Sequence, residues 1–214
     1  MKKNLLLFAL VLFCLTAAQA QVGPGLFVGG DIGISTNSSE ATFGGTTTDG
    51  PETFNFNISP AVGYYFNDNV AAGVRIGFGN STTTQPNDDE SSSTTFSIGV
   101  FGRYASTIDA NGNFAWFLEA NAGFGSQTSE TVSGNTTIEG DPVSTVGVGI
   151  APGLIYFPAP KFGFEVSLGN VIAFQNRTVE DANNSDNETV SNSLSFLDLG
   201  TMGLNLGFNY YFDR

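Results

Sequence analysis

Along most of the chain, large apolar residues alternate with small or polar residues at every second position. The run Val70-Ala-Ala-Gly-Val-Arg-Ile-Gly-Phe78 is typical, with the bulkier residues at even positions and Gly or Arg between them. Successive side chains of a β-strand point to opposite faces, so a period of two predicts strands with one apolar face. No segment after Ala20 keeps a helical period. Eight alternating runs occur, at 26–34, 54–66, 70–78, 96–104, 114–124, 146–156, 162–174 and 194–212.

Most of these runs contain nine or more residues. A membrane-spanning strand needs about 9–11 residues, whereas strands average about 5–6 residues in soluble proteins. Pro60 and Pro152 fall within two runs, and we expect β-bulges there because proline lacks the N–H of a ladder hydrogen bond. The connections alternate between short and long, which predicts an up-and-down meander with one trimmed rim and one elaborated rim. The short connections are 67–69, 106–113 and 158–161, and the long loops are 35–53, 79–95, 125–145 and 175–193.

The size of the apolar residues indicates which face of each strand points outward. In a soluble, lipocalin-like barrel the apolar face would fill the interior, but eight strands enclose a space only just wide enough for side chains. The many Phe, Leu, Ile and Val residues would overfill that space, whereas Gly, Ser, Asn and Ala fit it. The sequence therefore predicts an all-β protein, an eight-stranded antiparallel up-and-down transmembrane β-barrel with its apolar face toward lipid.

Charged residues within the runs fall on the face assigned to the lumen. An Arg or Lys in the middle of the bilayer costs about 2–4 kcal/mol on the lipid face, whereas charges of mixed sign can pair inside a narrow barrel. We therefore expect a lumen charge cluster that blocks the passage of ions. Its members are Asp31, Arg75, Arg103, Glu119 and Glu165.

Aromatic residues gather near the two ends of the predicted strands. Two aromatic girdles separated by aliphatic residues are typical of a membrane barrel. The girdle near the short turns would contain Tyr64, Tyr65, Phe66, Tyr104, Phe114, Trp116, Tyr156, Phe157, Phe162, Tyr210, Tyr211 and Phe212. The girdle near the long loops would contain Phe54, Phe56, Phe78, Phe96, Phe124, Phe174 and Phe196.

The first twenty residues have the pattern of a secretory signal peptide. Two lysines precede an apolar run from Leu5 to Leu15, and Ala18-Gln-Ala20 provides a small-x-small cleavage site. The apolar run is too short to span the hydrocarbon core as an anchor. We expect residues 1–20 to be removed and residues 21–214 to form the barrel domain.

Composition excludes several classes of function. The chain has 20 acidic and 7 basic residues and a formal net charge of −13, whereas nucleic-acid binding needs clustered basic residues. It has no His, and its single Cys, Cys14, lies in the predicted signal peptide. A His-based triad, a His metal site and an intrachain disulfide are therefore excluded, and we predict no metal and no cofactor.

The signal peptide, the eight runs and the ending Leu206-Gly-Phe208-Asn-Tyr210-Tyr-Phe212 resemble outer-membrane β-barrel proteins of the OmpA/OmpX-like group. The resemblance covers the mature chain and implies residence in the cell outer membrane, contact with its lipids and lipopolysaccharide, and assembly by the barrel-assembly machinery. Phe208, Tyr210 and Phe212 resemble the C-terminal signal that this machinery reads, although Asp213-Arg214 follow the last aromatic residue. The periplasmic domain of OmpA-like proteins is not expected. Barrels of this group have short periplasmic turns, which would put the long loops outside the cell and both termini in the periplasm.

The long loops are strongly acidic, with thirteen acidic residues against one basic residue, Arg177. Such like charge should attract divalent cations weakly and bind cationic surface partners in a salt-sensitive way. The segment Asp181–Glu188 resembles a calcium loop only faintly, because it lacks the central Gly and the spaced Glu. The acidic residues are Glu40, Asp49, Glu52, Asp88, Asp89, Glu90, Glu130, Glu139, Asp141, Glu180, Asp181, Asp186 and Glu188.

These features favour a non-enzymatic, integral outer-membrane barrel with a structural or surface-interaction role through its acidic loops. Enzymatic barrels of similar fold use a histidine in the active site, and this chain has none. Two alternatives remain: a narrow, porin-like channel or transporter for small solutes, and a secreted, lipocalin-like binder.

Overall fold

The computed structural model describes residues 23–43, 45–87, 89–134, 136–181, 184–197 and 204–212, so the predicted signal peptide lies outside the described residues. Within these ranges the secondary structure consists of strands, and no helix is long and apolar enough to cross a membrane. The strands are β1 (Gly25–Phe43), β2 (Thr46–Tyr65), β3 (Val70–Thr84), β4 (Glu90–Thr107), β5 (Phe114–Ser133), β6 (Thr136–Glu139), β7 (Val143–Ala159), β8 (Phe162–Leu168), β9 (Ile172–Asp181), β10 (Asn184–Phe196) and β11 (Leu204–Tyr211).

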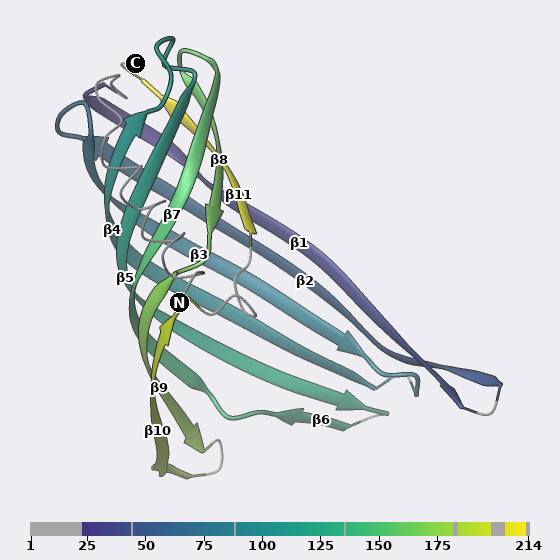
Figure 1. Ribbon diagram of the computed structural model, residues 1–214. Helices are drawn as coiled ribbons and strands as arrows, with labels where there is room; N and C mark the ends of the chain where they lie inside the picture. Colours follow the sequence, from purple (N-terminus) through teal and green to yellow (C-terminus); the bar gives the residue numbers. More distant parts are fainter. Residues whose placement is uncertain are drawn as a thin grey trace, which may run out of the picture.

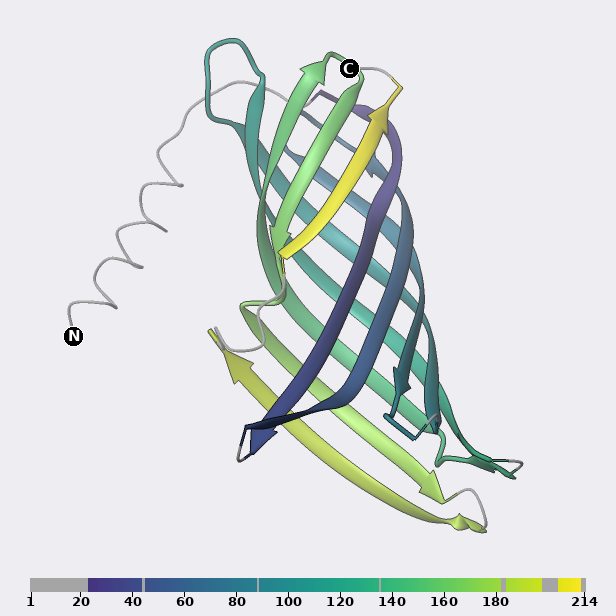
Figure 2. The ribbon, with the colours of Figure 1, turned by 90° about the vertical axis from the view of Figure 1, so that its right-hand side faces the viewer.

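The strands form the wall of one antiparallel barrel (Figures 1 and 2). Because β6 leads into β7, β8 into β9 and β10 into β11, the segments make up eight wall strands in chain order. Pairing of β1 with β11, from Phe27 opposite Tyr211 to Ile32 opposite Leu206, closes the short-turn half of the barrel. The beginning of β1 and the end of β11 lie at the short-turn end in Figure 1. The predicted eight-stranded, up-and-down β-barrel is confirmed.

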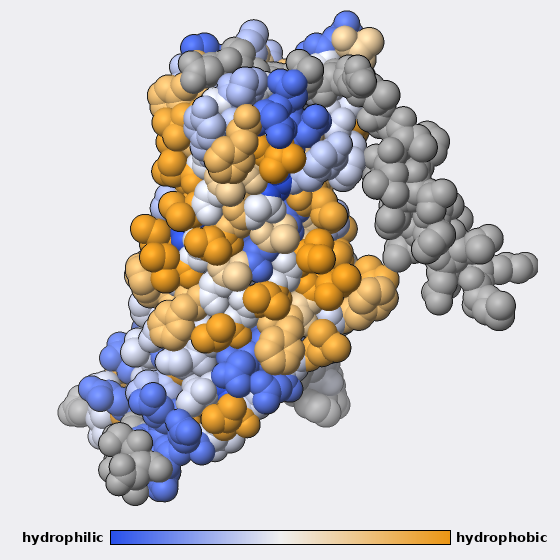
Figure 3. All heavy atoms as spheres, turned by 90° about the vertical axis from the view of Figure 1, so that its left-hand side faces the viewer, coloured by the Kyte–Doolittle hydropathy of each residue, from blue (hydrophilic) through white to orange (hydrophobic). Residues whose placement is uncertain are grey.

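Large apolar side chains cover the outer surface of the barrel. Ile34, Val74 and Leu206, for example, are 66%, 51% and 59% exposed, although burial of apolar area is the main driving force of folding in water. Figure 3 shows a broad band of hydrophobic side chains around the middle of the barrel, with hydrophilic side chains gathered at both ends. An exposed apolar belt of this extent fits a hydrocarbon environment, as the residue sizes predict.

The prediction of four long loops is wrong for most of their length, because the strands continue through them as β-hairpins. In the first predicted loop, β1 and β2 stay paired as far as Phe43 opposite Thr46. Side-chain hydroxyls join neighbouring strands there, with Thr53 and Thr83 3.0 Å apart and Ser91 and Thr131 3.1 Å apart. Both faces of these hairpins are exposed to water, so neither face needs apolar residues. The apolar alternation therefore ends there, although the backbone hydrogen bonds between the strands continue.

The last two predicted runs are each divided. The run 162–174 is divided between β8 and β9, and the run 194–212 between β10 and β11. The expected bulges at the two prolines are wrong, because Pro60 opposite Gly30 and Pro152 opposite Leu118 keep their register. The irregularity lies in the strand beside Pro152: β7 pairs with β8 from Gly153 onward and with β9 up to Ile150. Among the described residues β10 pairs only with β9, so β1–β11 pairing closes only the short-turn half of the barrel.

The short turns are held by side chains that accept backbone hydrogen bonds. The Asn67 amide oxygen accepts from the Asn69 and Val70 N–H groups, each at 2.9 Å. The Asp109 carboxylate accepts from the N–H of Phe114 at 2.8 Å and of Asn113 at 3.2 Å. These hydrogen bonds, above all the one from Phe114, favour the charged form and hold the pKa of Asp109 below its ordinary value.

Candidate functional site

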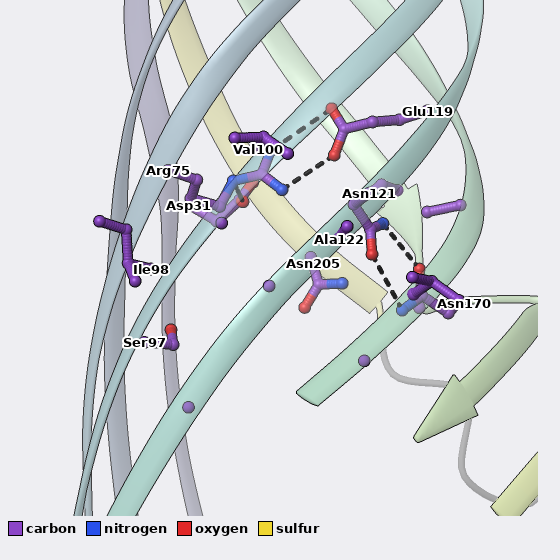
Figure 4. Close-up of a pocket in the computed structure, with 18 of the residues that line it drawn as sticks. Asp31, Arg75, Ser97, Ile98, Val100, Glu119, Asn121, Ala122, Asn170 and Asn205 are labelled. Atoms are coloured by element: carbon purple, nitrogen blue, oxygen red, sulfur yellow. Dashed lines mark hydrogen bonds and ion pairs between the residues drawn. The ribbon is translucent and has the colours of Figure 1, made fainter. Parts of the chain in front are cut away.

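The five charged residues predicted for the lumen come from five strands and lie together inside the barrel. Alternation along β1, β3, β4, β5 and β8 turns Asp31, Arg75, Arg103, Glu119 and Glu165 inward. They form a chain of alternating sign that runs from Asp31 through Arg75, Glu119 and Arg103 to Glu165. In Figure 4 Arg75 lies between Asp31 and Glu119, with dashed lines marking its interactions. We call these five residues the charge cluster.

Arg103 is the centre of the charge cluster. Its side chain is only 2% exposed, and its N–H groups donate to Glu119 at 2.7 and 3.1 Å and to Glu165 at 2.5 and 3.1 Å. Its guanidinium carbon also lies 4.1 Å from the centre of the Phe117 ring, a favourable cation–π geometry. The Asn209 side chain, 3% exposed in β11, donates to Glu165 as well. The buried carboxylates of Glu119 and Glu165 therefore both accept hydrogen bonds inside the barrel.

The other end of the charge cluster is looser. Arg75 donates to the Glu119 carboxylate at 2.8 Å, but its Nε lies 3.9 Å from the nearer Asp31 oxygen, beyond hydrogen-bond distance. The side chains of Asp31 and Arg75 are 21% and 27% exposed, against 4% for Glu119. Asp31 is thus the least enclosed carboxylate of the charge cluster.

Around the charge cluster and on its short-turn side, large buried side chains fill the lumen. Phe27 is 5.5 Å from Tyr65 and 5.6 Å from Tyr211 between ring centres, and Phe157 is 5.4 Å from Tyr211. The prediction that Tyr65, Phe157 and Tyr211 belong to an outer girdle is therefore wrong. Each follows an outward aromatic neighbour, and strand alternation turns it inward. This lumen floor consists of Phe27, Tyr65, Phe101, Phe117, Ile155, Phe157 and Tyr211.

The lumen floor is the part of the site that the sequence did not reveal. Phe27, Phe101 and Phe117 occupy the face of their runs that otherwise holds Gly, Ser and Asn. A large aromatic residue on the face of small residues was the sequence feature that could have indicated a filled lumen. Gly63 and Gly153 face the rings of Phe27 and Phe117, and a Cβ at either position would clash with them. Glycine beside each ring is what allows an eight-stranded barrel to hold it.

On the hairpin side of the charge cluster the lumen contains a cavity of about 430 Å³. Its base includes Asp31, Arg75 and Glu119, and its wall consists mostly of small or polar residues. At one side of the cavity the Asn121 side-chain N–H donates to the Asn170 side-chain oxygen at 2.9 Å, as Figure 4 shows. The polar residues of its wall include Ser97, Asn121, Thr145, Asn170, Gln175 and Asn205. We call this space the lumen cavity.

The charge cluster is suited to closing the lumen of the barrel and to keeping paired charges buried there. Among the described residues, no group of three or more His, Cys, Asp and Glu side chains could hold a metal ion. The charge cluster contains no nucleophile paired with a base, because each carboxylate of its buried part is bound to an arginine. With the lumen floor, the charge cluster closes the lumen toward the short turns.

Of the residues predicted as an assembly signal, Phe208 and Tyr210 lie on the outer face of β11, and Phe212 directly follows this strand. Phe208 and Phe212 are 56% and 41% exposed, and Tyr210 packs against Phe162 and Phe212 at 5.2 and 5.1 Å between ring centres. The Phe212 N–H donates to the Leu26 carbonyl at 3.0 Å, so the end of the chain is tied to β1. The three rings thus form a continuous outward stripe beside the closing seam.

The predicted acidic residues that the structure describes lie on the β-hairpins beyond the apolar belt. Eleven of them have described side chains, which are exposed or half-buried, while those of Asp88 and Asp186 lie outside the described part. We call these eleven the acidic hairpin residues; they are Glu40, Asp49, Glu52, Asp89, Glu90, Glu130, Glu139, Asp141, Glu180, Asp181 and Glu188.

Comparisons with known proteins agree with this architecture. A family model described as the outer membrane protein beta-barrel domain matches residues 5–212. No curated protein matches the chain. The outer membrane protein OprG of Pseudomonas aeruginosa is 12% identical with a TM-score of 0.50, over 91% of this chain and 98% of that chain.

Two other solved barrels are similar over most of their length. Neisserial surface protein A is 16% identical with a TM-score of 0.42, over 88% of this chain and 97% of that chain. Ail, the attachment invasion locus protein of Yersinia pestis, is 16% identical with a TM-score of 0.38, over 89% and 99%. At these identities the likeness concerns the fold alone. The family match extends over nearly the whole sequence, and the chain therefore belongs to the outer membrane β-barrel family.

Proposed function

We propose that this protein is a non-enzymatic outer-membrane barrel that presents its acidic hairpins at the cell surface and binds cationic partners there. The observation that carries the proposal is the extension of the strands past the apolar belt into hairpins that carry the acidic hairpin residues, opposed there by Arg177. A concentrated negative field of this kind attracts positively charged partners over about one Debye length. Paired strands hold the charges in place, which lowers the entropy lost on binding.

The blocked lumen supports this proposal over a channel. A pore for solutes needs a continuous aqueous path, and side chains close this one at the charge cluster and the lumen floor. The apolar belt would be surrounded by outer-membrane lipids, with lipopolysaccharide beside the hairpins. During biogenesis, the aromatic stripe of Phe208, Tyr210 and Phe212 would be read by the barrel-assembly machinery.

The test is binding of polylysine to the refolded barrel in nanodiscs of zwitterionic lipid. Raising the salt from ~0.1 M to ~1 M shortens the Debye length from about 10 Å to about 3 Å, so binding should weaken strongly. A variant with Glu40, Glu52, Glu130 and Glu139 all changed to Gln should bind much less. Asp68→Asn, which removes one charge at the short-turn end, should bind as the parent does. Equal binding by the hairpin variant and the parent would refute the proposal.

A further inference from the structure

We propose that the lumen cavity is a binding site for a small solute that carries a primary ammonium group, anchored by the carboxylate of Asp31. This site differs from the acidic hairpins in position and in ligand. It lies in the lumen, enclosed by the barrel wall, and it binds a small molecule. Three features of the lumen support this assignment: the charge balance of the charge cluster, the access to Asp31 and the chemistry of the cavity wall.

The charge cluster leaves one carboxylate in excess. It contains three carboxylates and two guanidinium groups, so its formal charge is −1. Glu119 accepts hydrogen bonds from both arginines, and Glu165 accepts from Arg103 and Asn209. Asp31 accepts no hydrogen bond from another described side chain, and Arg75 directs its terminal nitrogens toward Glu119 instead. The unbalanced negative charge therefore lies at Asp31.

Asp31 is also the carboxylate that a ligand can reach. It lines the lumen cavity, and its side chain is several times more exposed than that of Glu119. In the sheet, Asp31 lies opposite Gly207 of β11 on one side and Ser59 of β2 on the other. A Cβ at Gly207 would clash with the Asp31 carboxylate, so glycine at this position makes room for the carboxylate itself.

The wall of the lumen cavity fits an ammonium group better than a metal ion. An ammonium group has three N–H donors and needs one anionic acceptor with neutral oxygens around it. Asp31 provides the anion, and the polar side chains of Ser97, Asn121 and Asn205 line the same space (Figure 4). A Ca²⁺ site would use several oxygen ligands, commonly with more than one carboxylate, and the described residues offer no such group.

The size and surroundings of the lumen cavity agree with such a ligand. Its volume of about 430 Å³ lies within the range of roughly 300–1,000 Å³ usual for small-molecule sites. Because the lumen is closed toward the short turns, a solute enters from the hairpin end, where the acidic hairpin residues raise the local concentration of cations. The same negative field repels anions, so cations reach the lumen cavity in preference to anions.

The test is a calorimetric titration of the refolded barrel with n-butylammonium, with n-butanol as the uncharged probe of similar size. Butylammonium should bind saturably and butanol should not. Asp31→Asn should weaken binding of butylammonium by about ten- to a hundredfold, because it removes a charge-assisted hydrogen bond. Glu52→Gln makes the same change of charge on an exposed hairpin and should leave the affinity within about twofold of the parent.

A second variant fills the lumen cavity without touching Asp31. Gly125 lines the cavity, and a Cβ there would meet the Phe96 carbonyl at 3.7 Å and the Ser97 Cβ at 3.8 Å, which are ordinary contacts. Gly125→Leu should therefore fold and should lose saturable binding of butylammonium. Equal affinity in the parent and in Gly125→Leu, or in the parent and a folded Asp31→Asn, would overturn the proposal. An equal loss in Glu52→Gln and Asp31→Asn would assign the binding to the hairpins and would overturn it too.

Discussion

Replacing Arg103 by Ala should be among the most destabilising single changes in this barrel. The Arg103 side chain is 2% exposed, and the substitution removes the four hydrogen bonds that it donates to the carboxylates of Glu119 and Glu165. Glu119 keeps Arg75 at 2.8 Å, but among the described side chains Glu165 keeps only the Asn209 amide. Removing one partner of a buried ion pair leaves an uncompensated charge and costs about 3–5 kcal/mol. We expect a loss of this size in the free energy of unfolding.

Urea titration of the barrel in lipid vesicles measures this loss, with tryptophan fluorescence and heat-modifiable gel mobility as readouts. Arg177→Ala is the matched control, since Arg177 is exposed on a hairpin, and it should change the free energy of unfolding by less than ~0.5 kcal/mol. Combining Arg103→Ala with Glu165→Gln should restore part of the loss, about 0.5–3 kcal/mol, because the uncompensated charge is removed.

Two results would refute this reasoning. A loss below ~1 kcal/mol in Arg103→Ala would mean that the charge cluster is solvated rather than buried. An additive effect of Arg103→Ala and Glu165→Gln would mean that the two side chains do not depend on each other, contrary to their hydrogen bonds.

Three further predictions concern the two ends of the barrel. An NMR titration should give the Asp109 carboxyl a pKa below its ordinary value of 3.8, and a pKa at or above 3.8 would contradict this. The turn is then stabilised by this carboxylate above pH 3.8, and this stabilisation is lost as the pH falls through the lower pKa of the folded state. An epitope tag inserted after Gly134 should be reachable by antibody on intact cells, whereas one at Asn111 should not, and the reverse result would mean the opposite orientation. Calcium titrated into the barrel at low salt should give weak heat without a sharp transition, whereas a micromolar site would contradict delocalised binding.

Much of the fold follows from the period of two. The alternation in 70–78 and 96–104 identifies strands and assigns their faces, because hydrocarbon accepts only apolar side chains on one side. Beyond the belt, at Thr82 or Ser92, both faces meet water and the pattern no longer distinguishes a strand from a loop. The division of 162–174 beside Pro152 depends on which neighbour each half pairs with, and a single run does not reveal this.

The candidate site was predictable in part. Strand parity identified the five members of the charge cluster, because a charge within a membrane strand must face the lumen. The order of pairing follows from strand adjacency and tilt, which brought Arg103 to Glu165 across the barrel although they are 62 positions apart. The inward rings of Tyr65 and Tyr211 were missed because all aromatic residues near the short turns were counted in one girdle, whereas alternation separates Tyr64 from Tyr65 and Tyr210 from Tyr211.

The central claim is that the lumen of this outer-membrane barrel is closed toward the short turns, so that the protein is not a channel. Planar-bilayer recording from the purified wild-type protein tests it most directly. The charge cluster and the lumen floor close the path, so we expect no large, steady current steps at either polarity. Reproducible large steps from the wild type would contradict the account and favour the narrow channel instead.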